Sequence, residues 1–367
     1  MKILVIIGTR PEGIKLAPVI LALKANKRVK TIACATGQHK EILDQVFEIF
    51  NIKPDINLSI MQAEQTLAQL TAQVVTKVDA VLKELLPDLV LIQGDTTTVM
   101  ASAMACFYNN IPVGHVEAGL RSGNLWSPFP EEMNRSVAGI LASLHFAPTE
   151  RARQALLRAN VDQEKIFLTG NTVIDALQYI TAAKRPAGAE RILDKLEGKR
   201  FILVTAHRRE NFGQRFEEIC TGLKEIVQRN PDVAIVYPVH LNPNVQEPVS
   251  RILKGIERVL LIDPVEYNVL AHLLSSCTLV LTDSGGIQEE APSLGKPVLV
   301  MRTETERPEG IEAGTARLVG PCKEAILRET EKILHNEDEY LIMARAVNPY
   351  GDGQAAQRIV KAIEKYI

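Results

Sequence analysis

Short apolar runs rich in β-branched residues alternate along the whole chain with longer stretches of helical spacing. In the first half, the apolar runs are 2–7, 30–35, 89–93 and 113–116, and the clearest helical stretches are 66–86 and 97–109. In the second half, the runs are 201–205, 233–237, 258–262, 278–282 and 297–301, separated by helical stretches at 213–229, 266–275 and 285–294. A strand that is apolar throughout is buried on both faces, so this alternation predicts parallel sheets with helices on both sides.

The alternation occurs twice along the chain, which indicates two domains. A length of 367 residues also suits two domains rather than one. We therefore expect an α/β protein with two doubly wound, Rossmann-like domains. The pattern is interrupted at Gly170 and at the turn 185–188, and we place the boundary after residue 168. Because ligands of such folds bind at the carboxyl ends of the strands, two facing sheets would enclose a site in the cleft between the domains.

The composition excludes several classes of protein. Apolar residues make up 46% of the chain and charged residues 23%, which excludes intrinsic disorder and collagen-like fibres. The net charge of −2 gives no general reason to bind nucleic acid or an anionic membrane. No apolar run is long enough to span a bilayer, and the N-terminus does not have the pattern of a signal peptide. The five cysteines are scattered without a C-x-x-C pair, so we expect neither disulfides nor a zinc site. Free cysteines are typical of a reducing compartment, so we expect a cytoplasmic location.

Two cations follow the first predicted strand. The segment from Gly8 to Lys15 is a tight turn that delivers Arg10 and Lys15 near the start of a helix. Positive charge and free backbone N–H groups favour an anion at such a position. The dinucleotide fingerprint G-x-G-x-x-G is absent, so a nicotinamide cofactor is not indicated. The alternative interpretation is an ordinary helix start with two solvated cations.

Three acidic residues are candidate acid–base catalysts. Asp95 follows Gly94 at a strand end, where it could be catalytic or could simply cap the next helix. Glu117 stands among small residues and glycines, a setting that allows a ligand to approach the backbone closely. Glu131 opens a helix after two prolines, where the helix dipole favours an acid in any case.

The second half supplies a candidate anion site. His207 follows the strand 201–205, and His240 follows the next strand along the chain. A structural ion-pair cluster around His207 is the alternative. The strongest element is the turn of Ser284, Gly285 and Gly286, which follows a buried strand and opens a helix, so its N–H groups can hold a diphosphate. Glu290, one turn later, could accept both hydroxyls of a ribose, and Arg307 lies in a charged loop that could equally be solvated.

These residues all follow strands, and together they suit one kind of ligand. Cations, acids and a glycine turn at the strand ends fit a nucleoside diphosphate that carries a neutral group, most economically a sugar. At this point the chain resembles the non-hydrolysing UDP-N-acetylglucosamine 2-epimerases, which have a glycosyltransferase-B-like fold. The resemblance covers essentially the whole chain and is carried by the segments 8–15, 94–98, 115–121, 127–135, 169–177, 206–211, 237–243, 282–300, 305–310 and 348–353.

The resemblance implies reversible interconversion of UDP-N-acetylglucosamine and UDP-N-acetylmannosamine without an added cofactor or metal. It also implies a homodimer. The last helix of the family usually returns to the first domain, so the resemblance assigns 350–367 to the N-terminal domain with 1–168, and 169–349 to the UDP-binding domain. The implied catalytic residues are Asp95, Glu117, Glu131 and His207. The implied substrate contacts are Arg10, Lys15, Ser284, Gly285, Gly286, Glu290 and Arg307.

Some members of the family bind a second substrate molecule beside the active site. The resemblance indicates Gln38 for such a site, and His240 is a further candidate. Glu41 and Glu64 stand where some members have a neutral amide and an arginine. Their added negative charge would repel a second diphosphate, so substrate activation stays open at this point.

The residues also fit the chemistry of epimerisation at C2. The C2 proton is not next to a carbonyl, so its direct removal is too costly for a side chain. If a base instead removes this proton while UDP leaves C1, the intermediate is 2-acetamidoglucal, and inversion then needs acid–base groups on both faces of the ring. The leaving diphosphate needs positive charge and N–H donors.

Three other functions stay open from the sequence. One is a hydrolysing relative that releases free N-acetylmannosamine. Another is a glycosyltransferase of the same fold, which would usually need one base and an open acceptor groove. The third is a non-catalytic sensor of UDP-sugars. The three candidate acids favour the epimerase.

Overall fold

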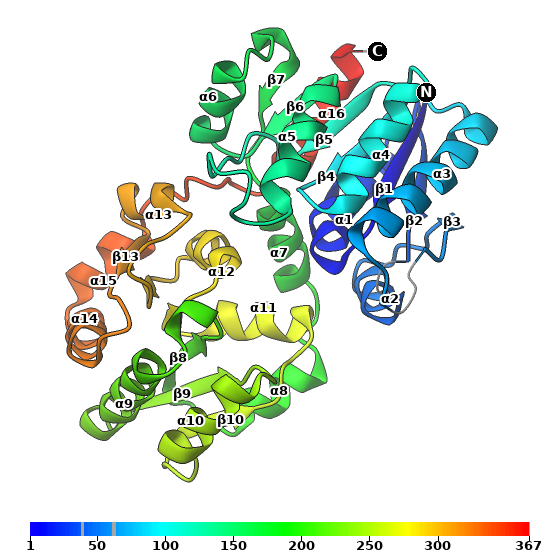
Figure 1. Ribbon diagram of the computed structural model, residues 1–367. Helices are drawn as coiled ribbons and strands as arrows, with labels where there is room; N and C mark the ends of the chain where they lie inside the picture. The colour runs from blue at the N-terminus through cyan, green and yellow to red at the C-terminus, as the bar shows by residue number, and fades with distance from the viewer. Residues whose placement is uncertain (38–39, 61–63, 367) are drawn as a thin grey trace. The chain divides into compact units, whose positions relative to one another are not determined.

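The computed structural model describes residues 1–37, 40–60 and 64–366. It divides the chain into two compact units (Figure 1). Unit 1 comprises Met1–Tyr179 and Tyr350–Ile367, and unit 2 comprises Ile180–Pro349.

Unit 1 is built on one parallel sheet. Seven strands of the described residues pair in the order β3-β2-β1-β4-β5-β6-β7. The long apolar runs form its centre because strands flanked by helices on both faces are buried throughout. The strands are β1 (Lys2–Ile7), β2 (Lys30–Ala35), β3 (Ile56–Asn57), β4 (Leu89–Gln93), β5 (Val113–Val116), β6 (Leu144–Ala147) and β7 (Ile166–Leu168).

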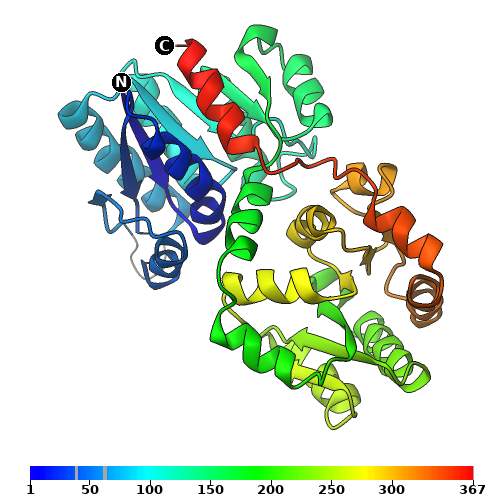
Figure 2. The same cartoon turned by 180° about the vertical axis from the view of Figure 1, so that it is seen from behind.

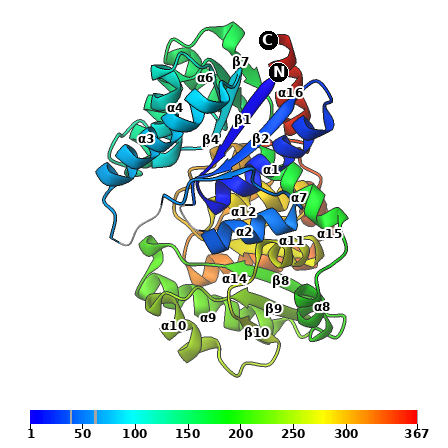
Figure 3. The ribbon, with the colours of Figure 1, turned by 90° about the vertical axis from the view of Figure 1, so that its right-hand side faces the viewer.

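Helices cover both faces of the unit 1 sheet. Figure 3 shows α3 and α4 on one side of the strands and α1 and α16 on the other. The helices of this unit are α1 (Arg10–Ala25), α2 (Lys40–Ile49), α3 (Leu67–Leu85), α4 (Thr97–Tyr108), α5 (Glu131–Leu141), α6 (Glu150–Arg158), the first part of α7 (Thr172–Ala182) and α16 (Ala355–Tyr366).

Unit 2 repeats the scheme with six strands of the described chain in the order β10-β9-β8-β11-β12-β13. They are β8 (Arg200–Thr205), β9 (Val233–Pro238), β10 (Val259–Ile262), β11 (Leu279–Thr282), β12 (Val298–Val300) and β13 (Ala316–Leu318). Its helices are α8 (Ala187–Asp194), α9 (Gln214–Arg229), α10 (Pro243–Leu253), α11 (Tyr267–Ser276), α12 (Gly285–Glu290), α13 (Pro308–Glu312), α14 (Lys323–His335) and α15 (Glu337–Ala344). The predicted α/β architecture with two doubly wound domains is confirmed.

The predicted helical stretch 285–294 is divided in the structure. It comprises α12 and a short 3₁₀ helix, Ala291–Leu294. Pro292 has no backbone N–H and therefore cannot continue the α-helical ladder, which accounts for the change of helix type.

The returning segment 350–367 belongs to unit 1. Figure 2 shows its helix α16 lying beside α1, against which it packs. The carboxylate of Asp175 in α7 accepts hydrogen bonds from the backbone N–H groups of Ala355 (3.2 Å) and Ala356 (2.8 Å), the first two residues of α16. These contacts hold the start of α7 to unit 1, so the division falls at 179/180, inside α7, rather than after residue 168.

All five cysteines are free, four of them buried and Cys322 exposed. Within the described residues, no helix is both long and apolar enough to cross a membrane. In the same part of the chain, no group of three or more His, Cys, Asp or Glu side chains could hold a metal ion.

Candidate active site

Glu117 is buried directly after β5 and is held by side chains from three other segments. Lys15 Nζ lies 2.6 Å from its Oε2, and Asn171 Nδ2 donates to its Oε1 at 3.2 Å. Gln93, the last residue of β4, donates to Oε2. The backbone of Glu117 has a φ of 64°, a region that residues with side chains seldom occupy except where the surroundings enforce it. This carboxylate is therefore fixed, and Lys15 is not a solvated cation.

Asp95, in the turn after β4, interacts with the other predicted acids. Burial raises its pKa, the Arg135 guanidinium that pairs with its carboxylate opposes this, and the negative charges of Glu117 and Glu131 raise the pKa further. The three carboxylates are thus close enough to influence one another's charge. The N-cap of α4 is Thr96, whose side chain accepts from the backbone N–H of Val99, so the interpretation of Asp95 as the capping residue is wrong.

Glu131 and Glu132, which open α5, differ in their surroundings. Glu132 is buried and accepts hydrogen bonds from the backbone N–H groups of Ser122 (3.0 Å) and Gly123 (3.1 Å). Glu131 is half-buried, and its Oε2 has no hydrogen-bond partner among the described residues. Glu132 therefore fixes the preceding loop, whereas the Oε2 of Glu131 takes no part in holding the described part of the chain.

Arg10, the first residue of α1, is half-buried. The turn before it packs closely against the start of α4, because a Cβ added at Gly8 would lie 2.8 Å from the Cβ of Thr98. A glycine is required there, since no side chain fits. The turns after β1 and β4 are therefore packed together, and they place Arg10, Lys15 and Asp95 at the same edge of the sheet.

In unit 2, the buried carboxylate of Asp283 organises the turn after β8. It accepts from the backbone N–H groups of His207 (2.9 Å) and Arg208 (2.8 Å) and from Asn211 Nδ2 (3.2 Å). The ring of His207 stacks on that of His240, with centroids 5.3 Å apart. Burial lowers the pKa of His207, Asp283 opposes this, and His240 adds to the lowering. The lowered pKa favours a neutral imidazole at His207.

The glycine turn between β11 and α12 lies next to two cations. A Cβ added at Gly285 would lie 3.9 Å from Arg208 Nη2 and 3.9 Å from Arg307 Cζ. Arg208 Nε is buried without a hydrogen-bond partner among the described residues. The N–H of Ser284 is bound to Thr282 Oγ1 at 2.9 Å, whereas Gly285 and Gly286 begin the helix and have no carbonyl partner within it. The turn can therefore hold an anion through two N–H groups and two guanidinium groups.

Two further predicted residues lie on α12 and beside it. A Cβ added at Gly286 would lie 3.7 Å from Glu290 Oε1, so this carboxylate reaches back toward the glycine turn. Arg307 pairs with Glu289, and its backbone N–H is held by Thr305 Oγ1 at 3.0 Å. Its guanidinium is thus fixed beside Gly285.

Comparison with known proteins identifies the family. The sequence profile of a family described as UDP-N-acetylglucosamine 2-epimerase matches residues 21–364. The chain belongs to the UDP-N-acetylglucosamine 2-epimerase family. It is 53% identical to the UDP-N-acetylglucosamine 2-epimerase of Salmonella typhimurium, over 100% of this chain and 99% of that protein. Identity to the Escherichia coli K12 enzyme of the same name is also 53%, over 99% of this chain and 98% of the relative.

A solved structure of the family has the same fold. The crystal structure of UDP-GlcNAc 2-epimerase from Neisseria meningitidis bound to UDP-GlcNAc superposes with a TM-score of 0.88 at 44% identity, and all of both chains is covered. The predicted family, enzyme class and glycosyltransferase-B-like fold are confirmed. The roles of the individual residues stay predictions.

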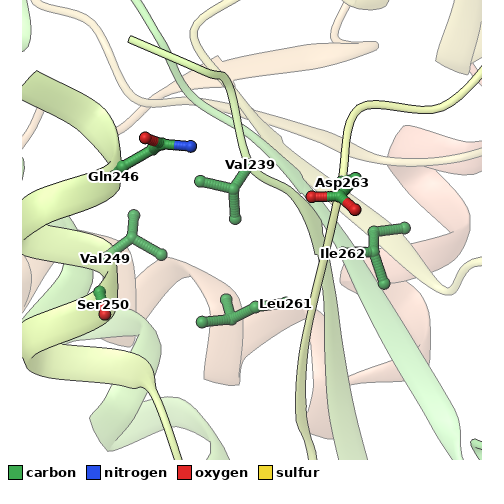
Figure 4. A pocket seen from close by; sticks show the side chains of 7 residues that line it. All are labelled: Val239, Gln246, Val249, Ser250, Leu261, Ile262 and Asp263. Atoms are coloured by element: carbon green, nitrogen blue, oxygen red, sulfur yellow. The ribbon is translucent and has the colours of Figure 1, made fainter. Parts of the chain in front are cut away.

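A cavity of about 570 Å³ lies beside the predicted second-site residue His240. Figure 4 shows Val239 and Leu261 pointing toward α10, with Asp263 at the strand end. None of its seven described lining residues is basic, and the second-site role of His240 stays a prediction. Gln38 lies outside the described residues.

Sequence reasoning missed several residues that hold the acids in place. Gln93 is the one polar residue of an otherwise apolar strand, a signal that could have revealed it. The imidazole of His115, whose pKa burial lowers to about 4, stays neutral, and its Nε2 lies 2.7 Å from the carbonyl oxygen of Gly94. The residues around the predicted acids that the sequence did not single out are Glu12, Gln93, His115, Arg135 and Asn171.

Proposed function

We propose that this protein interconverts UDP-N-acetylglucosamine and UDP-N-acetylmannosamine reversibly, without hydrolysis and without an added cofactor. The observation that carries the proposal is the grouping of Asp95, Glu117 and Glu131 in unit 1, since inversion at C2 needs more than one acid–base group. Membership of the family and the substrate held by the Neisseria relative support the choice of sugar nucleotide.

The reaction proceeds by elimination and re-addition. A base removes the C2 proton, the C2–H electron pair forms the C1–C2 double bond, and the C1–O bond breaks with its electron pair leaving on UDP. The intermediate is 2-acetamidoglucal. A proton then returns to C2 from the opposite face while UDP adds again to C1.

The surroundings of two acids suit different tasks in this reaction. Burial raises the pKa of Asp95 above its ordinary value, although the paired Arg135 guanidinium opposes this effect. Glu117 is paired with the Lys15 ammonium, which favours the carboxylate form. Two titratable groups whose surroundings act differently on their protonation are typical of acid–base pairs.

Unit 2 binds the UDP moiety. Ser284, Gly285 and Gly286 hold the diphosphate together with Arg307 and His207, and Glu290 binds the ribose. The positive charge of Arg307 and the N–H groups of the glycine turn stabilise UDP as it leaves. Arg10 contributes a further cation, and closure of the domains protects the unsaturated intermediate from water.

The proposal has three wider parts. The protein acts as a homodimer, it works in the cytoplasm, and its product supplies N-acetylmannosamine units for surface polysaccharide. A size measurement in solution tests the first part.

Incubation with UDP-N-acetylglucosamine in deuterated water tests the reaction. We expect one deuterium at C2 of both recovered UDP-sugars, detected by mass spectrometry and by loss of the H2 proton signal. A glycosyltransferase or a sensor would return substrate without deuterium. A hydrolysing enzyme would instead release free N-acetylmannosamine and UDP, and either result would refute the proposal.

A further inference from the structure

Glu12 is buried although it lies in the first turn of a helix, where acidic side chains usually face solvent. Its exposed fraction is 2%. Burial raises the pKa of its carboxyl group to about 7, although hydrogen bonds from Gly8, Thr96 and Thr9 act in the opposite direction. Burying a carboxyl group is costly, so its presence there calls for a function.

The hydrogen-bond donors to Glu12 come from two different turns. The backbone N–H of Gly8 donates to Oε2 at 2.6 Å, and Thr9 Oγ1 donates to Oε1 at 3.0 Å. Both residues lie in the turn after β1. Thr96 Oγ1 donates to Oε1 at 2.8 Å and lies in the turn after β4. Strands β1 and β4 are neighbours in the sheet, so the Glu12 carboxylate joins the ends of two adjacent strands.

Those two turns carry residues of the proposed reaction. The first leads into Arg10 and Lys15, and the second contains Asp95 directly before Thr96. Thr96 also caps α4 by accepting from the backbone N–H of Val99 at 3.4 Å. A shift of Thr96 would therefore move both the start of α4 and Asp95, which precedes Thr96.

We propose that Glu12 is a positioning residue that fixes the turn bearing Asp95 against the turn bearing Arg10 and Lys15. The inference rests on the proposed function of Asp95. Glu12 acts through its hydrogen bonds, whose donors are one N–H group and two hydroxyl groups.

Two substitutions of Glu12 separate hydrogen bonding from charge. Glu12→Met fills the same space without an acceptor, and we expect kcat to fall about 10- to 100-fold with KM changed less than about 3-fold, because small misplacements of catalytic groups are costly. In Glu12→Gln, the amide oxygen can accept from the N–H of Gly8. The amide NH₂ can donate to the hydroxyls of Thr9 and Thr96, which then act as acceptors. We expect its kcat to stay within about 3-fold of wild type.

Variants of Thr96 provide an independent test if Glu12→Met folds poorly. Thr96→Val removes the hydroxyl and should lower kcat as Glu12→Met does, whereas Thr96→Ser keeps the hydroxyl and should retain activity. The double variant Glu12→Met/Thr96→Val should lose less activity than the product of the two single effects, because both changes remove the hydrogen bond between Thr96 and Glu12. Multiplied effects would contradict the proposal.

Asp88→Asn is the matched control. Asp88 precedes β4, and its carboxylate accepts from the backbone N–H of Lys2 at 2.6 Å, so it joins the opposite ends of the same two strands. We expect normal kcat for this variant.

Amide hydrogen exchange gives a measurement that does not depend on activity. Glu12→Met should accelerate exchange in peptides covering 8–12 and 94–99, and Asp88→Asn should not. A folded Glu12→Met variant with wild-type kcat and wild-type exchange in these peptides would overturn the inference. Failure of the proposed function would appear separately, as wild-type protein that incorporates no deuterium.

Discussion

Asp95 lies among groups that act on its pKa in opposite directions. Burial and two neighbouring carboxylates raise the pKa, while Arg135 and Lys15 oppose them, and the pKa is raised overall. This balance suits a group that must both accept and release a proton.

Asp95→Asn tests this role directly. The amide keeps the size of the side chain but cannot exchange a proton, so we expect turnover to fall at least ~10²-fold. Deuterium incorporation at C2 measures the effect. Asp79→Asn is a control, because Asp79 is a carboxylate of α3 that pairs with Lys83 outside the site. Near-normal turnover of the Asp95 variant would contradict a catalytic role.

Glu12→Gln also changes the pH dependence of stability. The pKa of Glu12 is raised from 4.5 to about 7 in the folded protein, so the folded state holds this proton more tightly than the unfolded chain does. The resulting stability is present below pH 4.5 and is lost as pH rises through about 7. The amide does not titrate, so the Tm of the wild type should fall by several degrees relative to the variant between pH 5 and pH 8. If the difference in Tm between the wild type and the variant is the same at pH 5 and pH 8, Glu12 does not titrate in this range.

The sequence predicts acids at strand ends better than it predicts what surrounds them. Asp95 and Glu117 follow apolar strands directly, so their place at the edge of the sheet follows from topology. Glu12 lies in the first turn of a helix, where an acid ordinarily interacts with the helix dipole. Its burial depends on the close approach of two turns that are far apart in sequence, and no local pattern reveals that approach.

At the scale of elements, α16 completes the hydrophobic packing of unit 1. Its buried face includes Ile359 and Ile363, both fully buried, and the helix packs against α1. Arg358 Nη1 donates to the carbonyl oxygen of Thr169 at 3.1 Å, which adds a second attachment beside Asp175. Residues from the two ends of the chain therefore share one core.

Ile359→Ala tests this attachment. Removing a fully buried isoleucine side chain should lower the free energy of unfolding by about 2–5 kcal/mol. Chemical denaturation measures the change. Lys361→Ala, on the exposed side of the same helix, should change it by less than about 0.5 kcal/mol. Equal stability of the two variants would mean that α16 does not pack on unit 1 in solution.

The prediction of elements succeeded where strands are long and apolar throughout. The central strands β1, β4, β8 and β11 coincide with apolar runs in the sequence. The edge strands β3 and β13 have two and three residues, and such short segments have no detectable period. The two compact units divide at 179/180, later in the chain than the predicted boundary, because contacts of Asp175 with α16, which join distant parts of the chain, hold the start of α7 to unit 1.

At the scale of the whole molecule, the chain passes between the units twice, in α7 and at 349–350. Two connections restrict relative motion more than one would. The cleft between domains stays a prediction, and so does its closure on the substrate.

Small-angle scattering tests closure. If UDP bound to unit 2 draws the units together, the radius of gyration should decrease when UDP is added. Uridine, which has no diphosphate, is the matched control, and we expect it to leave the profile nearly unchanged. A profile that UDP also leaves unchanged would count against closure.

The position of α16 affects how the protein forms during translation. Residues 350–367 leave the ribosome after the whole of unit 2, so the surface of α1 that α16 covers stays uncovered while residues 180–349 are made. Unit 2 has all of its strands and helices by then and can fold first. The N-terminal part of the protein therefore acquires its final helix last, and a nascent chain stalled before residue 350 presents an apolar surface to chaperones.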